Sequence, residues 1–361
     1  MIHLHVRSWF SFLGGGSSPE DLVETAHRLE QPAIALTDTH GTYGAVRFQQ
    51  ACQQVGIHPV IGAEVTFHDA PLVLLAQHAG GYANLCQLLT LFHVRQDEPL
   101  TLGDLSRHHK GLFCLTGGIE SHLHRLIERR RLQQAKSWLH DLQSIYGDHL
   151  RLEVCNQRRP GDLYAAKQML RLAAELSIIP VATNDVRYAS PEAYRRYDLL
   201  TCVRLGLTVH EPHPARPSNA EAHIKSSEAM AALIPSRTAL DHSAALAEAC
   251  SVDLLSEHIT TPSAQIPSAY SPDQQLALLC IEGLQHKYPG EALPAALAQL
   301  NRELAVIADL QLDEFFLVVN EVVQEAHRRA IRCAGRGSAA NSIVAFLLNI
   351  TGVDPLQHNL L

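Results

Sequence analysis

The residues that could do chemistry fall into two groups, one near the end of the chain and one spread over its first half. At the end, Gly335, Arg336, Gly337 and Ser338 precede an apolar run. The first N–H groups of a helix have no partner within the helix, and glycine lets a ligand approach the backbone closely, so anions bind at such turns. Arg336 adds a planar cation, and Ser338 could cap the helix. The turn therefore indicates a phosphate contact, although an ordinary capped helix could have the same sequence.

The second group consists of histidines and acidic residues that follow, or lie late in, predicted β-strands. They are His5, Asp38, Glu64 and Asp185, with His3 and His40 as further candidates. Imidazole and carboxylate groups are ligands for divalent metals. In a barrel of alternating strands and helices, the carboxyl ends of the strands meet at one edge, where side chains from separate strands converge. A metal site is therefore a hypothesis, whereas any one of these residues alone is more often a cap or a surface residue.

Seven short β-rich runs would position this second group. They lie at residues 2–6, 33–37, 60–67, 72–76, 112–115, 150–154 and 178–182. Helical patterns fill most of the gaps, and the first of them is marked by Ser18 as N-cap and Pro19 at the first helical position. Strands separated mostly by helices predict an α/β fold with a parallel sheet, either a barrel or an open sheet.

The composition indicates a globular chain with one or two domains. It has 361 residues, of which 46% are hydrophobic and 18% charged, and a net charge of −8. This charge argues against a protein that simply coats DNA, although arginines cluster between residues 328 and 336. The longest apolar run, near residues 343–348, is too short to span a bilayer, and the eight scattered cysteines form no Cys-x-x-Cys pair. We therefore expect a cytoplasmic protein without membrane contact and without a disulfide framework.

The last hundred residues have a different pattern from the first half. Amphipathic helical spacing dominates residues 261–361. The segment 313–331 begins with the Phe-rich run at residues 315–319, which favours a strand, and then becomes helical. We expect a mainly helical region with the Phe-rich run in its core.

Four segments of the first half resemble the successive motifs of the polymerase-and-histidinol-phosphatase (PHP) domain. They are "LHVRSWFSFLGGGSSPEDLVETA", "ALTDTHGTYGAVRF", "PVIGAEV" and "VATNDVRY". The end of the chain resembles the entry to the palm in bacterial DNA polymerase III alpha subunits, the C-family polymerases; it reads "AGRGSAANSIVAFLLNITGVDPLQHNLL". Two further segments resemble those that join the PHP domain to the palm in the same polymerases, namely "YDLLTCVRLGLTV" and "HIKSSEAMAALI". This resemblance implies a distorted seven-stranded PHP barrel at residues 1–190, an extension and linker at 191–260, and a truncated palm at 261–361.

The resemblance also implies which residues occupy the family's metal-ligand positions. The matching residues are His5, Arg7, Asp38, Thr39, Glu64, Pro71, Gly118, Gln157, Asp185 and Arg187. Arginine replaces histidine at Arg7 and Arg187, and Thr39 replaces a third histidine, for which His40 is a candidate substitute. A guanidinium cannot deprotonate, so it opposes metal binding and instead pairs with carboxylates. We predict salt bridges from Arg7 and Arg187 to Asp38, Glu64 or Asp185, and a degenerate site that holds at most one Zn²⁺ or Mn²⁺ weakly.

At the other end, the resemblance assigns the triphosphate of an incoming nucleotide to Gly335, Arg336, Gly337 and Ser338. Family polymerases also use Mg²⁺ held by aspartates that follow this region, whereas Asp354 belongs to a turn motif. We therefore expect the N-terminal part of a DNA-directed DNA polymerase, of the error-prone branch that serves translesion and repair synthesis. Its partners would be a DNA primer-template and dNTP in the full enzyme, and the chain alone would be catalytically incomplete.

Two alternatives from other functional classes are open. A non-catalytic PHP scaffold would bind a proofreading exonuclease or another replisome subunit. A free-standing PHP phosphoesterase or 3′–5′ exonuclease would need intact metal ligands and no palm, which the residues above do not match.

Overall fold

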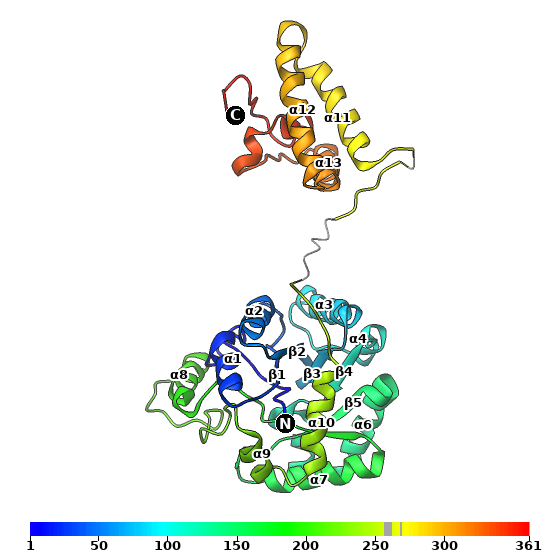
Figure 1. The fold of residues 1–361 in the computed structure, drawn as a ribbon. Helices are drawn as coiled ribbons and strands as arrows, with labels where there is room; N and C mark the ends of the chain where they lie inside the picture. The colour runs from blue at the N-terminus through cyan, green and yellow to red at the C-terminus, as the bar shows by residue number, and fades with distance from the viewer. Residues whose placement is uncertain (256–261, 268, 361) are drawn as a thin grey trace. The chain divides into compact units, whose positions relative to one another are not determined.

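The computed structural model of the chain describes residues 1–255, 262–267 and 269–360. They form two compact units, Met1–Ser256 and Glu257–Leu361 (Figure 1). Within the described residues, no helix is both long and apolar enough to cross a membrane. Six of the cysteines are buried, Cys86 is half-buried, and Cys333 is exposed.

A curled sheet of six strands forms the centre of the first unit. The strands are β1 (Ala33–Leu36), β2 (His58–Phe67), β3 (Ala70–Ala76), β4 (Leu112–Leu115), β5 (Leu150–Val154) and β6 (Ile179–Ala182). They lie in the order in which they occur along the chain. All four residues of β1 and of β4 are buried, as expected for strands covered on both faces.

The sheet is mixed, so the prediction of a parallel sheet is wrong for one strand. β3 runs antiparallel to both β2 and β4, whereas β1–β2, β4–β5 and β5–β6 are parallel pairs. Only His68 and Asp69 separate β2 from β3. Two residues can turn a hairpin but cannot make the crossover that a parallel pair requires. The short spacing between the two β-rich runs was the signal for this reversal.

The predicted seventh strand at residues 2–6 is not confirmed as a regular strand. This segment makes a single isolated bridge, between Val6 and Val186. Its backbone nevertheless bonds to both edges of the sheet: His3 O accepts from Ala35 N at 2.9 Å, and His5 O accepts from Val186 N at 2.9 Å. The N-terminal segment therefore lies between β1 and the residues that follow β6.

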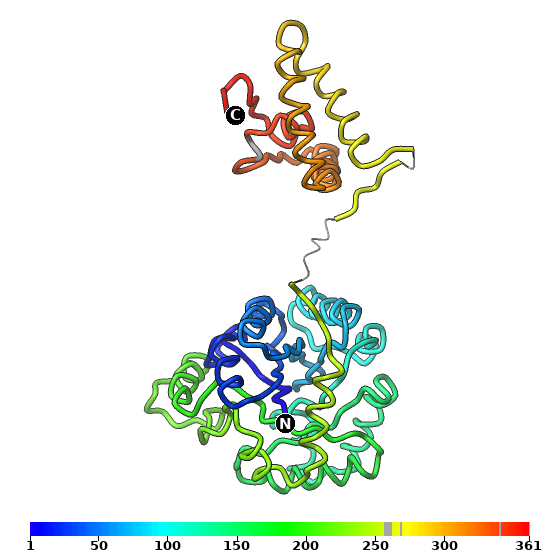
Figure 2. Tube along the Cα trace, viewed as in Figure 1, coloured from blue at the N-terminus to red at the C-terminus, as the bar shows by residue number. Residues whose placement is uncertain are grey.

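Ten α-helices of the described first unit lie around the sheet (Figure 1 and Figure 2). They are α1 (Pro19–Arg28), α2 (Ala45–Val55), α3 (Ala79–Val94), α4 (Leu102–His108), α5 (His122–Glu128), α6 (Leu132–Tyr146), α7 (Asp162–Leu176), α8 (Tyr194–Leu205), α9 (Ser227–Leu233) and α10 (Arg237–Glu248). The sequence prediction for α1 is confirmed, because Ser18 accepts from Asp21 N in a capping box with Pro19 in the first turn. α10 packs against β6 and β1, and its Ser243 Oγ accepts from Ile2 N at 2.9 Å.

The described second unit contains only helices. They are α11 (Pro272–Lys287), the 3-10 helix η4 (Gly290–Ala292), α12 (Leu293–Asp309), α13 (Asp313–Arg328), the 3-10 helix η5 (Gly337–Asn341) and α14 (Ile343–Leu347). The Phe-rich run is part of α13, so the prediction that it begins as a strand is wrong. Leu317 and Val323 of α13 are buried in the core of the unit, which shows that tertiary packing outweighs β propensity here.

Candidate functional site

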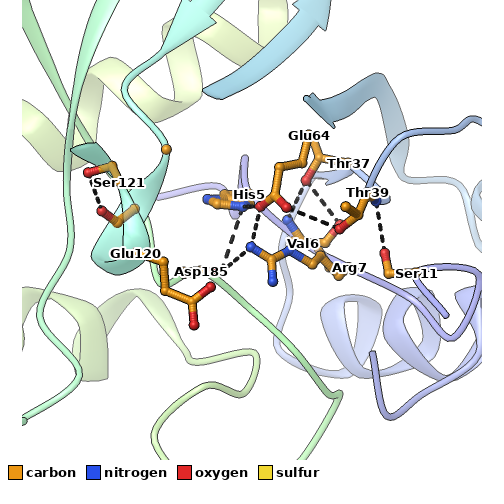
Figure 3. A network of polar contacts seen from close by, with 12 residues as sticks. His5, Val6, Arg7, Ser11, Thr37, Thr39, Glu64, Glu120, Ser121 and Asp185 are labelled. Atoms are coloured by element: carbon orange, nitrogen blue, oxygen red, sulfur yellow. Dashed lines mark hydrogen bonds and ion pairs between the residues drawn. The ribbon is translucent and has the colours of Figure 1, made fainter. Parts of the chain in front are cut away.

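His5 lies at the centre of a buried polar network in the first unit (Figure 3). Its Nδ1 is 2.8 Å from Oε1 of Glu153, and its Nε2 is 3.1 Å from Oε2 of Glu64 and 3.6 Å from Oδ1 of Asp185. Burial opposes protonation of His5, but Glu153 and Asp185 outweigh it and raise the pKa of the imidazole to about 10. His5 is therefore a cation near neutral pH, with both ring nitrogens protonated.

Arg7 places a guanidinium between two of the predicted metal ligands. Its Nη2 contacts Oε2 of Glu64 and lies 3.5 Å from Oδ1 of Asp185. Both partners are almost fully buried. Burial alone would raise the pKa of Glu64, but Arg7 and then His5 outweigh it and lower that pKa to about 2. The predicted pairing of Arg7 with Glu64 and Asp185 is thus present in the structure.

Arg187 also binds Asp185. Its Nε donates to Oδ1 of Asp185 at 2.9 Å, and its Nη2 donates to Oε2 of Glu120 at 3.0 Å. Its Nη1 donates to the hydroxyl of Tyr197 at 3.2 Å. Although burial opposes ionisation of Asp185, Arg187, His5 and Arg7 together hold its pKa well below the usual range. Asp185 is therefore an ionised carboxylate shared among three cations.

Asp38 does not join these arginines, contrary to one of the predicted pairings. Its Oδ1 accepts from Ser8 N and from Ser11 Oγ, each at 2.7 Å, and its Oδ2 accepts from Ser8 Oγ at 2.8 Å. Burial raises the pKa of Asp38, while the serine donors favour its ionised form. This carboxylate fixes the loop that follows Arg7.

The two further histidine candidates lie apart from the network. Nε2 of His3 is 3.0 Å from Lys225 O, and burial lowers the pKa of His3 to about 4. His40 stacks on Phe92, with ring centroids 3.9 Å apart, and its Nε2 is 2.8 Å from Thr66 Oγ1. Of the six candidates, the structure thus brings together His5, Glu64 and Asp185.

Glu153 and Glu120 complete the network and were missed in the sequence. Glu153 is fully buried; besides His5, it accepts from Gly117 N at 2.9 Å and from Thr183 Oγ1 at 2.5 Å. In β5 it lies on the face that carries Arg151, opposite the face of Leu150, Leu152 and Val154. Polar residues that alternate with apolar ones are typical of a strand with one exposed face. Glu153 could therefore have been identified only if the second face of β5 were already known to be buried.

Other positions that the resemblance assigned to metal ligands contact their neighbours. Thr39 Oγ1 donates to Oε1 of Glu64 at 3.1 Å, and Gln157 Nε2 donates to Asp185 O at 3.2 Å. Gly118 lies beside the Asp185 carboxylate, since a Cβ there would be 3.0 Å from its Oδ2. Across the described part of the chain, no group of three or more His, Cys, Asp or Glu side chains has the arrangement of a metal site.

The candidate phosphate loop lies in the second unit. Arg336, Gly337 and Ser338 are exposed, and Gly337 has a φ of +67°, which favours glycine. The prediction that Ser338 caps the apolar helix is wrong: η5 intervenes, and Ser342 accepts from Ala345 N as the N-cap of α14. Asp354 is a turn residue, as expected, because its Oδ1 accepts from Leu356 N at 2.9 Å.

Comparison with known proteins gives matches to both units. Residues 3–157 match the PHP domain, and residues 274–361 match the family described as the bacterial DNA polymerase III alpha NTPase domain. The chain is 35% identical over 381 residues to an error-prone DNA polymerase of Symbiobacterium thermophilum, covering 100% of this chain and 35% of that protein. It is 34% identical to DNA polymerase III subunit alpha of Bacillus subtilis, covering 100% of this chain and 33% of that protein. The chain is also 34% identical to an error-prone DNA polymerase of Pseudomonas fluorescens, and the match covers 99% of this chain and 34% of that protein. The chain thus spans about one third of the length of these relatives.

Proposed function

Because the chain belongs to the family of bacterial DNA polymerase III alpha subunits and error-prone DNA polymerases, we propose that it forms the N-terminal part of a DNA-directed DNA polymerase. The observation that carries this proposal is similarity along the whole chain, through both units, to polymerases of both kinds. In this assignment, residues 1–190 are the PHP barrel, residues 191–260 are its extension and linker, and residues 261–361 begin the palm. DNA primer-template, dNTP and Mg²⁺ would be bound by the full-length enzyme.

Primer extension tests the polymerase assignment. The product of the complete gene should extend a DNA primer with dNTP and Mg²⁺, whereas this chain alone should incorporate no nucleotide, because the carboxylates that hold Mg²⁺ would lie beyond residue 361. Sequencing the DNA past the codon for Leu361 shows whether the reading frame continues into the rest of a palm. A complete gene product that hydrolyses phosphoesters but does not extend primers would overturn the proposal.

The PHP site is proposed to be degenerate. The supporting observation is the Arg7 guanidinium between Glu64 and Asp185, joined by Arg187 on Asp185. Several divalent cations need anionic and neutral ligands to offset their mutual repulsion, and here the guanidinium groups of Arg7 and Arg187 already pair with Glu64 and Asp185. The donor set therefore does not fit a metal cluster.

A phosphodiesterase assay tests this second part of the proposal. With Mn²⁺ or Zn²⁺ added, neither a 3′-mismatched DNA end nor a generic phosphodiester should be hydrolysed above the rate of a protein-free control. Robust 3′–5′ exonuclease turnover that chelator abolishes would contradict the degenerate assignment.

The error-prone branch is the finer proposal. The arginines at Arg7 and Arg187 and the segment "HVRSWFSFLGGG" support it. Identity of 35% to an error-prone DNA polymerase and 34% to a DNA polymerase III subunit alpha favours neither branch. Primer extension across an abasic site by the complete gene product is the test: bypass supports the error-prone role, and arrest opposite the lesion contradicts it.

A further inference from the structure

The segment between Gly335 and Ser342 is fixed at both of its ends. At the first end, Gly335 N donates to Ile350 O at 2.7 Å. At the second end, Ser342 begins α14, whose residues Ile343 and Val344 are fully buried in the core of the second unit. The exposed residues 336–338 therefore project from a short loop whose two anchors are part of one packed core.

Glu303 of α12 forms the second anchor. Its Oε2 accepts from Ser342 Oγ at 2.7 Å and from Val344 N at 3.3 Å. Its Oε1 accepts from Ile343 N at 3.0 Å and from Gln299 Nε2 at 3.0 Å. Two oxygens thus serve four donors, three of which belong to the first turn of α14. Charge-assisted bonds of this kind are about twice as strong as neutral ones.

This arrangement decides which N–H groups remain for an anion. The N–H groups of Ile343 and Val344 are the ones that a helix N-terminus would offer to phosphate, but both already donate to Glu303. A phosphate near the carboxylate of Glu303 would also meet its negative charge. The N–H groups of Ile343 and Val344 are thus not free for an anion, whereas the backbone and guanidinium of residues 336–338 are exposed.

We propose that Glu303 is a positioning residue for the triphosphate contact: it occupies the N-terminus of α14 and thereby sets the geometry of residues 336–338, which receive the phosphate. The inference rests on the proposed polymerase function, in which residues 335–338 would contact the triphosphate of the incoming dNTP. Glu303 itself touches no substrate.

Hydrogen exchange and triphosphate titration of the 361-residue chain test the inference together. Glu303→Gln keeps the shape of the side chain but replaces one acceptor oxygen with a donor group, so two of the four donors lose their acceptor, at least one of them at the start of α14. Glu314→Gln is the matched control, because Glu314 also accepts a backbone N–H, from Ala264 at 3.1 Å, but not at α14. Ser342→Ala removes one donor from the same anchor while keeping the carboxylate, and it serves if Glu303→Gln does not fold.

In Glu303→Gln, the amides of residues 336–345 should exchange about tenfold faster, the effect of losing one charge-assisted hydrogen bond, while α11 and α13 keep their wild-type rates. Binding of dATP, followed by amide shifts of Gly337 and Ser338, should weaken by a similar factor in this variant and remain unchanged in Glu314→Gln.

Three results would be decisive against parts of this account. Unchanged exchange at residues 336–345 overturns the inference. Equal acceleration across the whole second unit also overturns it, because Glu303 would then only stabilise the fold. A wild-type chain whose Gly337 and Ser338 amides do not respond to dATP overturns the proposed phosphate contact, while the exchange rates still decide whether Glu303 sets the loop.

Discussion

Arg7 carries a charge that a change of pH does not remove, because a guanidinium stays protonated in proteins. In the network around His5, the ionised carboxylates of Glu64 and Asp185 are matched by cations of the chain itself. A buried ion pair contributes little when complete, but the loss of one partner leaves an uncompensated charge in a medium of low dielectric constant. The network should therefore be sensitive to single truncations.

Arg7→Ala should lower the free energy of unfolding of the first unit by about 3–5 kcal/mol, because it leaves Glu64 buried without its strongest partner. Arg47→Ala is the control: Arg47 pairs with Glu20 at 2.9 Å, but the two side chains are 51% and 44% exposed. That change should cost at most about 1 kcal/mol. Urea denaturation of both variants is the measurement, and equal losses would contradict a special role for the buried pair.

The sequence predicted the contacts of some site residues but not of others. His5, Glu64 and Asp185 come together as the strand-end placement indicated, and the salt bridges of Arg7 and Arg187 follow from the charge of guanidinium. The partner of Asp38 could not be predicted, because it depends on the path of the loop that brings Ser8 and Ser11 to it. Such contacts depend on the folded path of the chain and not on residue type.

At the scale of elements, the loop after Arg7 fixes one side of the network. Trp9 N donates to Ser17 O at 2.8 Å, and Gly15 N donates to Ser11 O at 3.1 Å. Gly15 packs directly on the backbone of Ser8, where an added Cβ would lie 1.9 Å from the carbonyl oxygen. Since Ser8 also holds Asp38, glycine is required at position 15 for the loop to close.

Gly15→Ala should therefore destabilise the first unit by roughly 1–3 kcal/mol or more, the usual cost of forcing atoms into a packed site. Gly103→Ala is the control, since a Cβ in this α4 residue meets only ordinary contacts at 3.7 and 3.8 Å. There the change should stabilise the helix by about 0.5–1 kcal/mol. Thermal melts with opposite shifts support the argument, and a Gly15→Ala melt at the wild-type temperature contradicts it.

Elements with strong local signals were predicted correctly, and those set by distant contacts were not. The capping box of Ser18 and Asp21 specifies the start of α1 within four residues. Six of the seven predicted strands are present, but the segment at residues 2–6 depends on two sheet edges that are far away in sequence. In the second unit, α13 is helical because its apolar side chains pack against α11 in the core of that unit. Local β propensity contains no information on that packing.

At the scale of the whole molecule, buried titratable groups give the first unit a defined pH dependence. His3 has a pKa of about 4 in the folded protein, below its usual value, so unfolding takes up a proton as the pH falls from 6.5 to 4. Glu64 has a pKa of about 2, so its stabilising effect is present above pH 4.5 and is lost as the pH falls through 2. His5 has a pKa of about 10, so its effect is present below pH 6.5 and is lost as the pH rises through 10.

The free energy of unfolding of the first unit should therefore rise from pH 2 to about pH 6.5 and fall from there to pH 10. Urea denaturation followed by tryptophan fluorescence from pH 3 to pH 10 measures this profile, because Trp9 and Trp138 are both in this unit. In His3→Gln, the part of the rise between pH 4 and 6.5 should be smaller. A profile that is flat from pH 6.5 to 10 would contradict the charged state assigned to His5.

The most direct test of the central claim is the metal content of the whole chain, purified without chelator and analysed for zinc, manganese and iron. Because Arg7, Arg187 and His5 pair with the carboxylates of the site, we expect well under one equivalent of metal in the wild-type chain. EDTA should not change its melting temperature. The Arg7→His, Arg187→His variant, which returns imidazoles beside Glu64 and Asp185, should bind more metal than the wild type. About three tightly held metal ions in the wild-type chain, lost together with stability on chelation, would contradict the account.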